Sequence, residues 1–297
     1  MGICKDRVVV VTGAGAGIGR EHALEFARQG ARVVVNDVAA PDAVVKEIRA
    51  LGGEAVANRD DISDWSGAGA AIGAALEAFG TVHTVVNNAG ILRDKMLVNM
   101  DVDQWDAVLK VHLRGTFCVT RHAIDHWRAQ SKAGTPVPAP RVVNTSSPSG
   151  LFGNLGQINY GSAKAAIAAF TVMAADELAR LGVGVNAVAP TALTDMTAGL
   201  DSYVAAVEEE RQRTGFDAGD PANISPLVVY LGSEASAGIT GRVFTIKGGE
   251  ISVAETWVKG PRAVRDRRWE VGEIADLLPG LVAQARPNTQ INGSPRA

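Results

Sequence analysis

The stretch TGAGAGIG, Thr12–Gly19, decides the fold because it joins an apolar run to an amphipathic segment. The run Val8–Val11 predicts a buried parallel strand, and residues 20–29 predict a helix that stops at Gly30. A strand, a glycine-rich turn and a helix, in that order, open a nucleotide-binding α/β unit. Glycines let such a turn approach a pyrophosphate closely, and the helix N-terminus favours its negative charge.

The glycine spacing does not fit the common dinucleotide pattern G-x-G-x-x-G, whose last position falls on Ile18 or Arg20. The pattern that fits is T-G-x-x-x-G-x-G, with glycines at Gly13, Gly17 and Gly19. A glycine loop alone is a weak signal, since a flexible turn has the same composition. Its place between a strand and a helix favours nucleotide binding, so we expect Gly13, Gly17, Ile18 and Gly19 to contact a cofactor.

Composition narrows the class of protein. The chain has 297 residues, of which 46% are hydrophobic and 21% charged, which suits a packed globular domain. Its net charge of −3 gives no case for nucleic-acid binding. The two cysteines, Cys4 and Cys118, form no disulfide framework, and no apolar run reaches membrane-spanning length. We expect a cytoplasmic protein with neither a metal site nor membrane insertion.

Strands and helices alternate without a break over residues 5–249, which predicts one α/β domain of the doubly wound Rossmann type. Its parallel sheet of about seven strands should carry helices on both faces. The strands are expected at residues 8–11, 32–36, 54–58, 84–86, 141–145, 183–189 and 242–246. Longer helices are expected at residues 65–79, 103–130, 159–181 and 221–232. The domain is assigned to residues 1–249, and the polar segment 191–218 is interpreted as a mobile lid.

Asp37 follows the second strand, where an acid commonly accepts hydrogen bonds from the adenosine ribose. A carboxylate there also repels a 2′-phosphate, and the loop residues Ala14 and Ala16 offer no positive charge to bind one. These features favour NAD over NADP. The alternative is that Asp37 only caps the next helix.

Polar side chains follow the third and fourth strands as well. Asp61, with Ile62 beside it, lies just past the third strand, where an acid can accept from the adenine amino group. Asn88, Ala89 and Gly90 follow the fourth strand and are expected to line the cofactor groove. Taken alone, this Asn-Ala-Gly run is also an ordinary loop signal.

Three residues in the second half of the chain could carry chemistry together. Ser147 lies at the carboxyl end of the fifth strand, and Tyr160 and Lys164 share a helix face at i, i+4. Free tyrosine has a pKa near 10, which a neighbouring cation would lower. Tyr160 could then exchange a proton with an alcohol or a carbonyl while Ser147 holds the same oxygen. The alternative is a Tyr and a Lys that share a face by accident.

Together these motifs resemble the short-chain dehydrogenase/reductase family over residues 5–249. The matching features are T-G-x-x-x-G-x-G, N-N-A-G at residues 87–90, the serine after strand five, and Y-x-x-x-K. The resemblance implies catalytic Ser147, Tyr160 and Lys164, a nicotinamide cofactor that Tyr160 and Lys164 also contact, and a homodimer or homotetramer. The family's Pro-Gly after strand six is Pro190-Thr191 here, and the usual threonine is displaced, with Thr194 nearest.

Further stretches are similar to the dehydrogenase part of peroxisomal multifunctional enzymes: residues 35–37, 91–94, 111–115 and 153–157. Those enzymes act on (3R)-hydroxyacyl-CoA and on 17β-hydroxysteroids. The resemblance therefore implies oxidation of a secondary alcohol, with the acyl-CoA and the steroid as competing small-molecule substrates. An NAD-sensing regulator on the same fold is the alternative from another class, although a sensor has no need of Ser147, Tyr160 and Lys164.

His112 departs from the family, which has an Asn in this helix that supports a proton relay. His112 could carry the relay and titrate near its usual pKa of about 6.5, or it could be an interior hydrogen-bonded His.

The extension, residues 250–297, is expected to pack at a subunit interface or to be a solvated surface. It contains five basic residues that could instead meet the phosphates of an acyl-CoA: Lys259, Arg262, Arg265, Arg267 and Arg268.

Overall fold

The computed structural model describes residues 2–194, 201–255, 257–291 and 293–295. The chain separates into two compact units, Met1–Ala254 and Glu255–Ala297. The first contains the sheet and every candidate site residue. Part of the segment interpreted as a lid, residues 195–200, lies outside the described residues.

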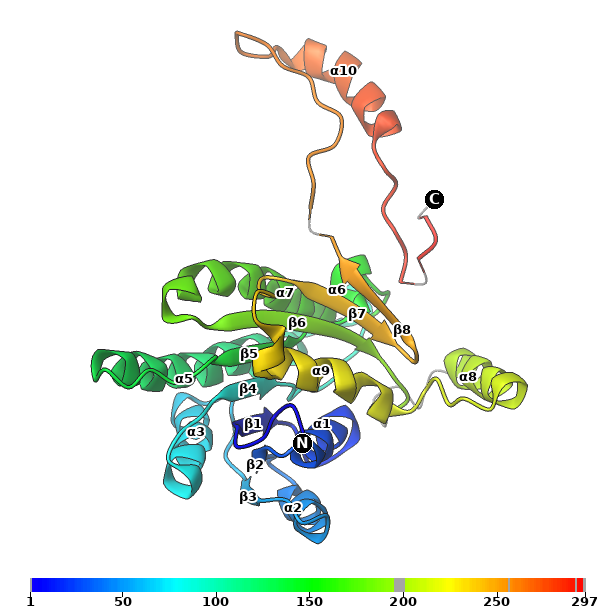
Figure 1. Cartoon of the computed structure of the whole chain (residues 1–297). Coiled ribbons are helices and arrows are strands. Elements are labelled where there is room, and N and C mark those ends of the chain that lie inside the picture. The colour runs from blue at the N-terminus through cyan, green and yellow to red at the C-terminus, as the bar shows by residue number, and fades with distance from the viewer. Residues whose placement is uncertain (1, 195–200, 256, 292, 296–297) are drawn as a thin grey trace. The chain divides into compact units, whose positions relative to one another are not determined.

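One eight-stranded sheet organises the first unit, in the order β3-β2-β1-β4-β5-β6-β7-β8 (Figure 1). The strands are β1 (Val8–Thr12), β2 (Arg32–Asn36), β3 (Ala55–Asn58), β4 (Thr84–Asn87), β5 (Arg141–Thr145), β6 (Gly184–Thr191), β7 (Val243–Lys247) and β8 (Glu250–Ala254). Strands β1 to β7 are parallel, which confirms the predicted doubly wound α/β fold. The order reverses between β1 and β4, and ligands of such sheets bind outside the carboxyl ends of the strands at that point.

The eighth strand differs from the expectation of about seven parallel strands. β8 pairs antiparallel with β7 and starts opposite Lys247, inside the stretch that was assigned to the extension. The turn is Gly248-Gly249, with Gly248 at φ +52°, a conformation that favours a two-residue hairpin. The sequence analysis treated this glycine pair as the end of the domain. The sheet, and the first compact unit, continue to Ala254.

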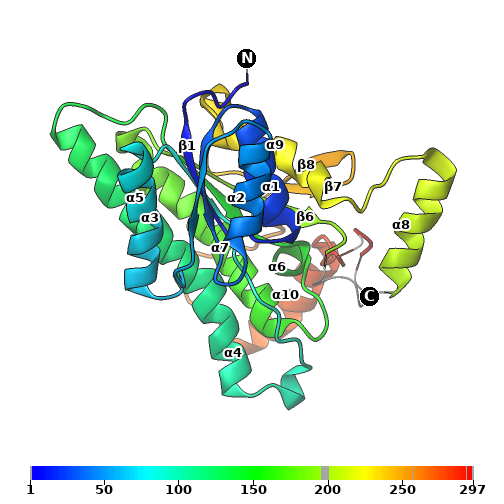
Figure 2. The ribbon, with the colours of Figure 1, turned by 90° about the horizontal axis from the view of Figure 1, so that it is seen from below.

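Helices cover both faces of the sheet, as predicted (Figure 1 and Figure 2). They are α1 (Gly17–Arg28), α2 (Pro41–Ala50), α3 (Trp65–Phe79), α4 (Val102–Leu109), α5 (Gly115–Lys132), α6 (Pro148–Phe152), α7 (Ile158–Leu178), α8 (Asp201–Thr214) and α9 (Ser225–Gly232). The α1, α2 and α9 helices lie on one face, and α3, α5 and α7 on the other. Helix α8 stands away from the sheet in both views.

The apolar run of β1 explains why the strand is buried on both sides. Val9 and Val11 pack into the core below α1, α2 and α9, whereas Val8 and Val10 pack into the core below α3, α5 and α7. All four side chains are fully buried. A central parallel strand with two covered faces therefore shows a continuous valine run and not an alternating one.

The long helix predicted at residues 103–130 is not uniform. It begins one residue earlier, where Asp101 is the N-cap and forms a capping box with Gln104. A π-helical segment, Lys110–Arg114, then joins α4 to α5. Such segments are rare and often mark functional sites. Apolar spacing along the helix gives no sign of this interruption, so the sequence analysis did not predict it.

The second unit contains α10 (Val271–Gln284). Ahead of this helix, Arg265 and Arg267 both form ion pairs with Glu273, and the Arg265 guanidinium lies 4.4 Å from the ring centroid of Trp269. Two of the five basic residues considered for phosphate binding are thus already paired with an acid. None of the helices in the described parts of the chain is long and apolar enough to cross a membrane.

Candidate active site

The glycine loop is locked against the end of β4. The Asn88 and Ala89 amides donate to Thr12 Oγ1 at 3.0 and 3.1 Å, and Asn88 Nδ2 donates to the Thr12 and Gly13 carbonyls at 3.1 Å each. A Cβ on Gly13, which has φ +62°, would lie 2.6 Å from Ala89 Cα. A Cβ on Gly19 would lie 2.1 Å from the Gly13 carbonyl oxygen. Both glycines are therefore required by close backbone packing.

Helix α1 presents its first turn to the carboxyl end of the sheet. Its N-cap is Ala16, which supplies no capping side chain, and the first turn contains no acid. The first N–H groups of the helix therefore suit a bound anion. Gly17 has φ +52°, and Thr194 lies beside it, because a Cβ there would be 3.5 Å from Thr194 Cγ2. Ile18 is partly buried against the adjoining core. Pro190 is near the carboxyl end of strand β6.

Asp37 faces the glycine loop. Its two carboxylate oxygens accept from the Gly15 amide at 3.0 Å and the Ala39 amide at 2.9 Å. A Cβ on Gly15 would lie 2.8 Å from the carboxylate carbon, so the carboxylate lies directly against the loop. The next helix has Ala40, not Asp37, as its N-cap. The alternative reading of Asp37 as a helix cap is therefore wrong.

Asp61 and Ile62 have different environments after β3. The Asp61 carboxylate is exposed and accepts from the Ser63 amide at 2.9 Å. Partial burial raises the pKa of Asp61, but hydrogen bonds from Ser63 and the nearby cations Lys110 and Arg114 outweigh it, so the net shift is downward. The carboxylate stays ionised as an acceptor. Ile62 is buried, 6% exposed, and belongs to the core.

Ser147 is the N-cap of the short helix α6, directly after β5. Its Oγ accepts from the Ser149 amide at 3.1 Å, and the side chain is 7% exposed. Ser147 also acts on Tyr160 of the next helix, where it lowers the pKa of the phenol. Helix α6 packs so closely on α7 that a Cβ on Gly150 would lie 2.7 Å from Lys164 Cβ. This packing brings the three predicted catalytic residues together.

Burial dominates the electrostatics of Tyr160 and Lys164. Lys164 Nζ donates to the Thr145 carbonyl at 2.6 Å and lies 5.6 Å from the Tyr160 ring centroid. Desolvation lowers the pKa of Lys164 to about 7. Desolvation also raises the pKa of Tyr160, against the hydrogen bond with Ser147, which lowers it. The net shift of the Tyr160 pKa is upward, whereas the sequence analysis expected a neighbouring cation to lower it. Because water is largely excluded around Tyr160, a cation that binds beside it would lower the pKa of the phenol strongly.

His112 lies in the π-helical segment with its ring edge-on to Tyr160, 5.2 Å between centroids. Its Nε2 is 3.0 Å from the Ile91 amide nitrogen and 2.8 Å from the Ile91 carbonyl oxygen. The pKa of His112 is lowered to about 3, chiefly by burial and then by the charge of Lys164, while the Ile91 hydrogen bond raises it. The expectation that His112 titrates near neutral pH is wrong: the imidazole is neutral there. Gly90 makes room for it, since a Cβ would lie 2.2 Å from His112 Cε1.

Within the described residues, His112 Nδ1 is buried and has no hydrogen-bond partner. The tautomer decides what this atom offers, because Nε2 either accepts from the Ile91 amide or donates to its carbonyl. In the first case Nδ1 carries a proton, and in the second it accepts one. Either tautomer therefore leaves Nδ1 available to one polar partner, as a donor in the first case and as an acceptor in the second.

Asn159 is a site residue that the sequence analysis missed. It is fully buried, its Nδ2 donates to the Arg93 and Gln104 carbonyls at 2.9 and 3.2 Å, and its Oδ1 accepts from the Tyr160 amide at 2.8 Å. These bonds fix the first turn of α7 and hence the position of Tyr160. The available signal was an asparagine in the first turn of a helix, where such side chains bond to backbone groups.

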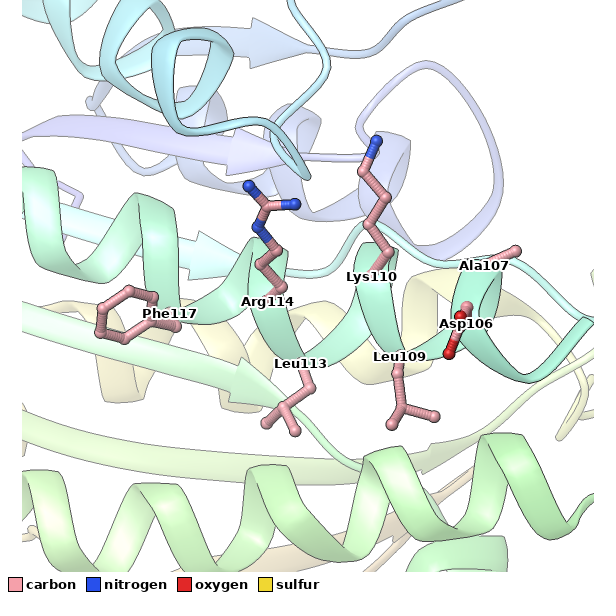
Figure 3. Close-up of a pocket in the computed structure, with 7 residues that line it drawn as sticks. All are labelled: Asp106, Ala107, Leu109, Lys110, Leu113, Arg114 and Phe117. Atoms are coloured by element: carbon pink, nitrogen blue, oxygen red, sulfur yellow. The ribbon is translucent and has the colours of Figure 1, made fainter. Parts of the chain in front are cut away.

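A shallow cavity of about 640 Å³ lies elsewhere, on the helical run from α4 to α5 (Figure 3). Its lining residues are Asp106, Ala107, Leu109, Lys110, Leu113, Arg114 and Phe117. Lys110 and Arg114 extend from one side of the run, and Leu109 and Leu113 from the other. None of the candidate catalytic residues lines this cavity.

The sequence matches known proteins along its whole length. A family model described as short chain dehydrogenase matches residues 7–204. A Mycobacterium tuberculosis protein named hydroxyacyl-CoA dehydrogenase ChsB1 is 47% identical over 97% of this chain and 92% of its own length. The peroxisomal hydratase-dehydrogenase-epimerase of Saccharomyces cerevisiae is 43% identical over 82% of this chain, which spans 26% of that protein.

The fold matches solved structures as well. A crystal structure of a short chain dehydrogenase from Mycobacterium avium is 45% identical, with a TM-score of 0.88 over 99% of this chain and 100% of that chain. The full-length peroxisomal multifunctional enzyme type 2 from Drosophila melanogaster is 35% identical, with a TM-score of 0.73 over 93% of this chain and 45% of that chain. The chain belongs to the short-chain dehydrogenase family of oxidoreductases.

Proposed function

We propose that the protein is an NAD-dependent dehydrogenase that interconverts a 3-hydroxyacyl-CoA and the corresponding 3-oxoacyl-CoA. The observation that carries the proposal is the grouping of the partly buried Tyr160 with Ser147 and Lys164, at the same sheet edge as the glycine loop. The names of two relatives, a hydroxyacyl-CoA dehydrogenase and a hydratase-dehydrogenase-epimerase, support the acyl-CoA over the 17β-hydroxysteroid. No observation favours the alternative, an NAD-sensing regulator on the same fold.

In this proposal, Ser147, Tyr160 and Lys164 have different roles in the reaction at the substrate oxygen. In the oxidation, the Tyr160 phenolate accepts the hydroxyl proton of the alcohol, and in the reduction the phenol returns it. Ser147 Oγ accepts from the Ser149 amide, so its hydroxyl proton is free of that bond and can turn from Tyr160 to the substrate oxygen. Lys164 supplies positive charge in a desolvated place and binds the cofactor ribose. The cofactor, when bound, takes up or supplies the hydride.

The residues at the sheet edge fit a dinucleotide. Gly13, Gly17, Ile18 and Gly19 form the close-packed loop ahead of α1, whose first turn has N–H groups suited to a pyrophosphate. Asp37 holds the adenosine ribose, and Asp61 with Ile62 the adenine. Asn88, Ala89 and Gly90 line the groove, and Pro190 and Thr194 border the nicotinamide. The Asp37 oxygens each keep a second acceptor position beyond their bond to a backbone amide.

Asp37 sets the choice of cofactor in this proposal. The native protein should bind NADH at least about tenfold more tightly than NADPH, because a carboxylate bonds ribose hydroxyls and repels a 2′-phosphate. Asp37→Ala should lose most of that preference. Fluorescence titration with both cofactors measures it, with Asp42→Ala in the first turn of α2 as the matched control. Equal affinities of the native protein for NADH and NADPH would contradict the role.

His112 is proposed to carry the proton relay as a neutral imidazole. His112→Asn keeps a polar side chain and should retain kcat within about tenfold, whereas His112→Leu should lose about a hundredfold. The measurement is kcat for both variants at fixed pH, with thermal unfolding as a check on packing. Equal losses in both variants would leave His112 with a packing role only.

We also propose a homodimer or homotetramer, in line with two exposed apolar surfaces. One is the α4–α5 run with its cavity, where Phe117 is 46% exposed. The other is the edge strand β8, where Ile251 and Val253 are 55% and 52% exposed, and natural proteins cover such edges. Phe117→Glu should therefore lower the mass measured by light scattering, and Leu51→Glu, at an exposed site on the end of α2, should not. An unchanged mass for Phe117→Glu would exclude this surface.

The substrate class is tested by supplying NAD with (3R)-hydroxyacyl-CoAs or with 17β-hydroxysteroids and following NADH absorbance. The proposal expects turnover with the acyl-CoAs. Turnover with steroids alone would show that the substrate is a steroid and not an acyl-CoA. Tight NADH binding without turnover of any alcohol would favour the alternative of an NAD-sensing regulator. The cytoplasmic location remains part of this proposal, in line with two buried cysteines that form no disulfide.

A further inference from the structure

A chain of hydrogen bonds reaches Ser147 from two loops, residues 91–95 and 153–157, that contain none of the predicted catalytic residues. Gln157 Nε2 donates to Asp94 Oδ2 at 2.7 Å, and Gln157 Oε1 accepts from Ser149 Oγ at 2.8 Å. The Ser149 amide in turn donates to Ser147 Oγ at 3.1 Å. One amide side chain therefore joins the loop after β4 to the turn that carries Ser147.

The backbone holds the same two loops together. The Lys95 amide donates to the Gly156 carbonyl at 2.8 Å, and Lys95 pairs with Gln157 as an isolated parallel bridge. Gln157 is also the N-cap of α7, and its carbonyl accepts from the Gly161 amide at 2.6 Å. Since Tyr160 follows three residues later, it is a neighbour of Gln157 on the same turn.

We propose that Gln157 and Asp94 are positioning residues for the reaction: Gln157 orients Ser147 through Ser149 and fixes the Asp94 carboxylate near Tyr160. This inference rests on the proposed function, because it assigns the pair an effect on the two residues that contact the substrate oxygen. Neither residue is proposed to contact the substrate itself.

The electrostatic part of the proposal follows from the groups around Tyr160. The titratable groups that face it are Lys164 on α7, His112 in the π-helical segment, and Asp94 in the loop after β4. Besides burial, the Asp94 charge raises the pKa of Tyr160. The Gln157 amide that holds Asp94 is neutral, so it fixes the carboxylate without cancelling its charge.

Two substitutions should move the pH dependence of oxidation in opposite directions. Asp94→Asn keeps an acceptor for Gln157 and removes the negative charge, so the rise of kcat with pH should shift to lower pH. Gln157→Glu keeps the acceptor for Ser149 but replaces the donor to Asp94 with a second carboxylate. The two carboxylates together add negative charge near Tyr160, so the rise should shift to higher pH. The measurement is kcat between pH 6 and 10 with NAD and a (3R)-hydroxyacyl-CoA as the probe. Asp103→Asn, at an exposed site in the first turn of α4, is the matched charge control.

A third variant tests the orientation of Ser147. Gln157→Leu removes the bonds to both Asp94 and Ser149, so kcat should fall about tenfold with KM within about twofold. Gln157→Glu should recover most of kcat at its own optimum pH, because the Ser149 bond survives. Full kcat in Gln157→Leu would overturn the orienting role.

The charge effect is overturned if Asp94→Asn and Gln157→Glu leave the pH profile unchanged or shift it in the same direction. The wild-type protein and Tyr160→Phe separate this failure from failure of the proposed function. No turnover of a (3R)-hydroxyacyl-CoA by the folded wild-type protein would refute the function itself, and wild-type activity in Tyr160→Phe would refute only the role of Tyr160. An inactive Tyr160→Phe beside an unshifted Asp94→Asn would refute only the inference.

Discussion

Tyr160→Phe is expected to lower kcat by about a thousandfold and to leave the affinity for NADH within about twofold. The substitution keeps the ring that packs edge-on against His112 and removes only the hydroxyl that exchanges the proton. Steady-state kinetics with NAD and a (3R)-hydroxyacyl-CoA, with NADH titration of the free protein, measures both quantities.

The matched control for this prediction is Tyr230→Phe. Tyr230 is 39% exposed on α9, and its hydroxyl donates to the nearby Ala235 carbonyl at 3.2 Å, so this variant should keep native turnover. If Tyr160→Phe retained most of its activity, the proton would have to pass through another group, and the assignment of Tyr160 would be lost.

Lys164→Ala is expected to reduce kcat/KM by about a thousandfold and to weaken NADH binding as well, because one side chain serves both the tyrosine and the cofactor. The amine is fully desolvated and donates to Thr145, so its loss also leaves a cavity and a bare carbonyl. Kinetics and NADH titration are read beside a thermal unfolding curve for the variant.

Lys164→Met separates charge from volume. It fills most of the space and removes the positive charge, so activity should stay low while stability recovers. Native activity in Lys164→Met would show that the charge contributes nothing to the reaction, whatever the alanine variant does.

The fold could be predicted from local patterns because each pattern has one physical cause. The valine run of β1 is continuous because both faces of the strand are covered. The loop glycines are required because a Cβ on Gly13 would collide with Ala89, and a Cβ on Gly19 would collide with the Gly13 carbonyl. The family that these motifs indicated is confirmed by the comparisons. The β8 strand was missed because the turn before it, Gly248-Gly249, also resembles the end of a domain.

The sequence predicted which residues form the site but not their electrostatic environment. Ser147, Tyr160 and Lys164 were named from their spacing, and the structure brings them together at the end of β5. Their roles stay predictions. Spacing carries no information on desolvation, which reverses the expected direction of the Tyr160 pKa and keeps His112 neutral.

The residues that support the candidate catalytic side chains were harder to predict. Asn159 and Gln157 bond to residues more than 50 positions away along the chain, so the sequence does not show which groups they bond. The π-helical segment could not be predicted either, because it is defined by its backbone hydrogen bonds and not by its composition.

The central claim is that this chain moves a hydride between a secondary alcohol and NAD. The most direct measurement uses a (3R)-hydroxyacyl-CoA that carries deuterium at C3, incubated with the protein and unlabelled NAD. Mass spectrometry of the recovered cofactor should show deuterium on the reduced nicotinamide and none on NADH formed from the unlabelled substrate. A reduced cofactor without the label, or no reduced cofactor from a folded protein that binds NADH, would contradict the account.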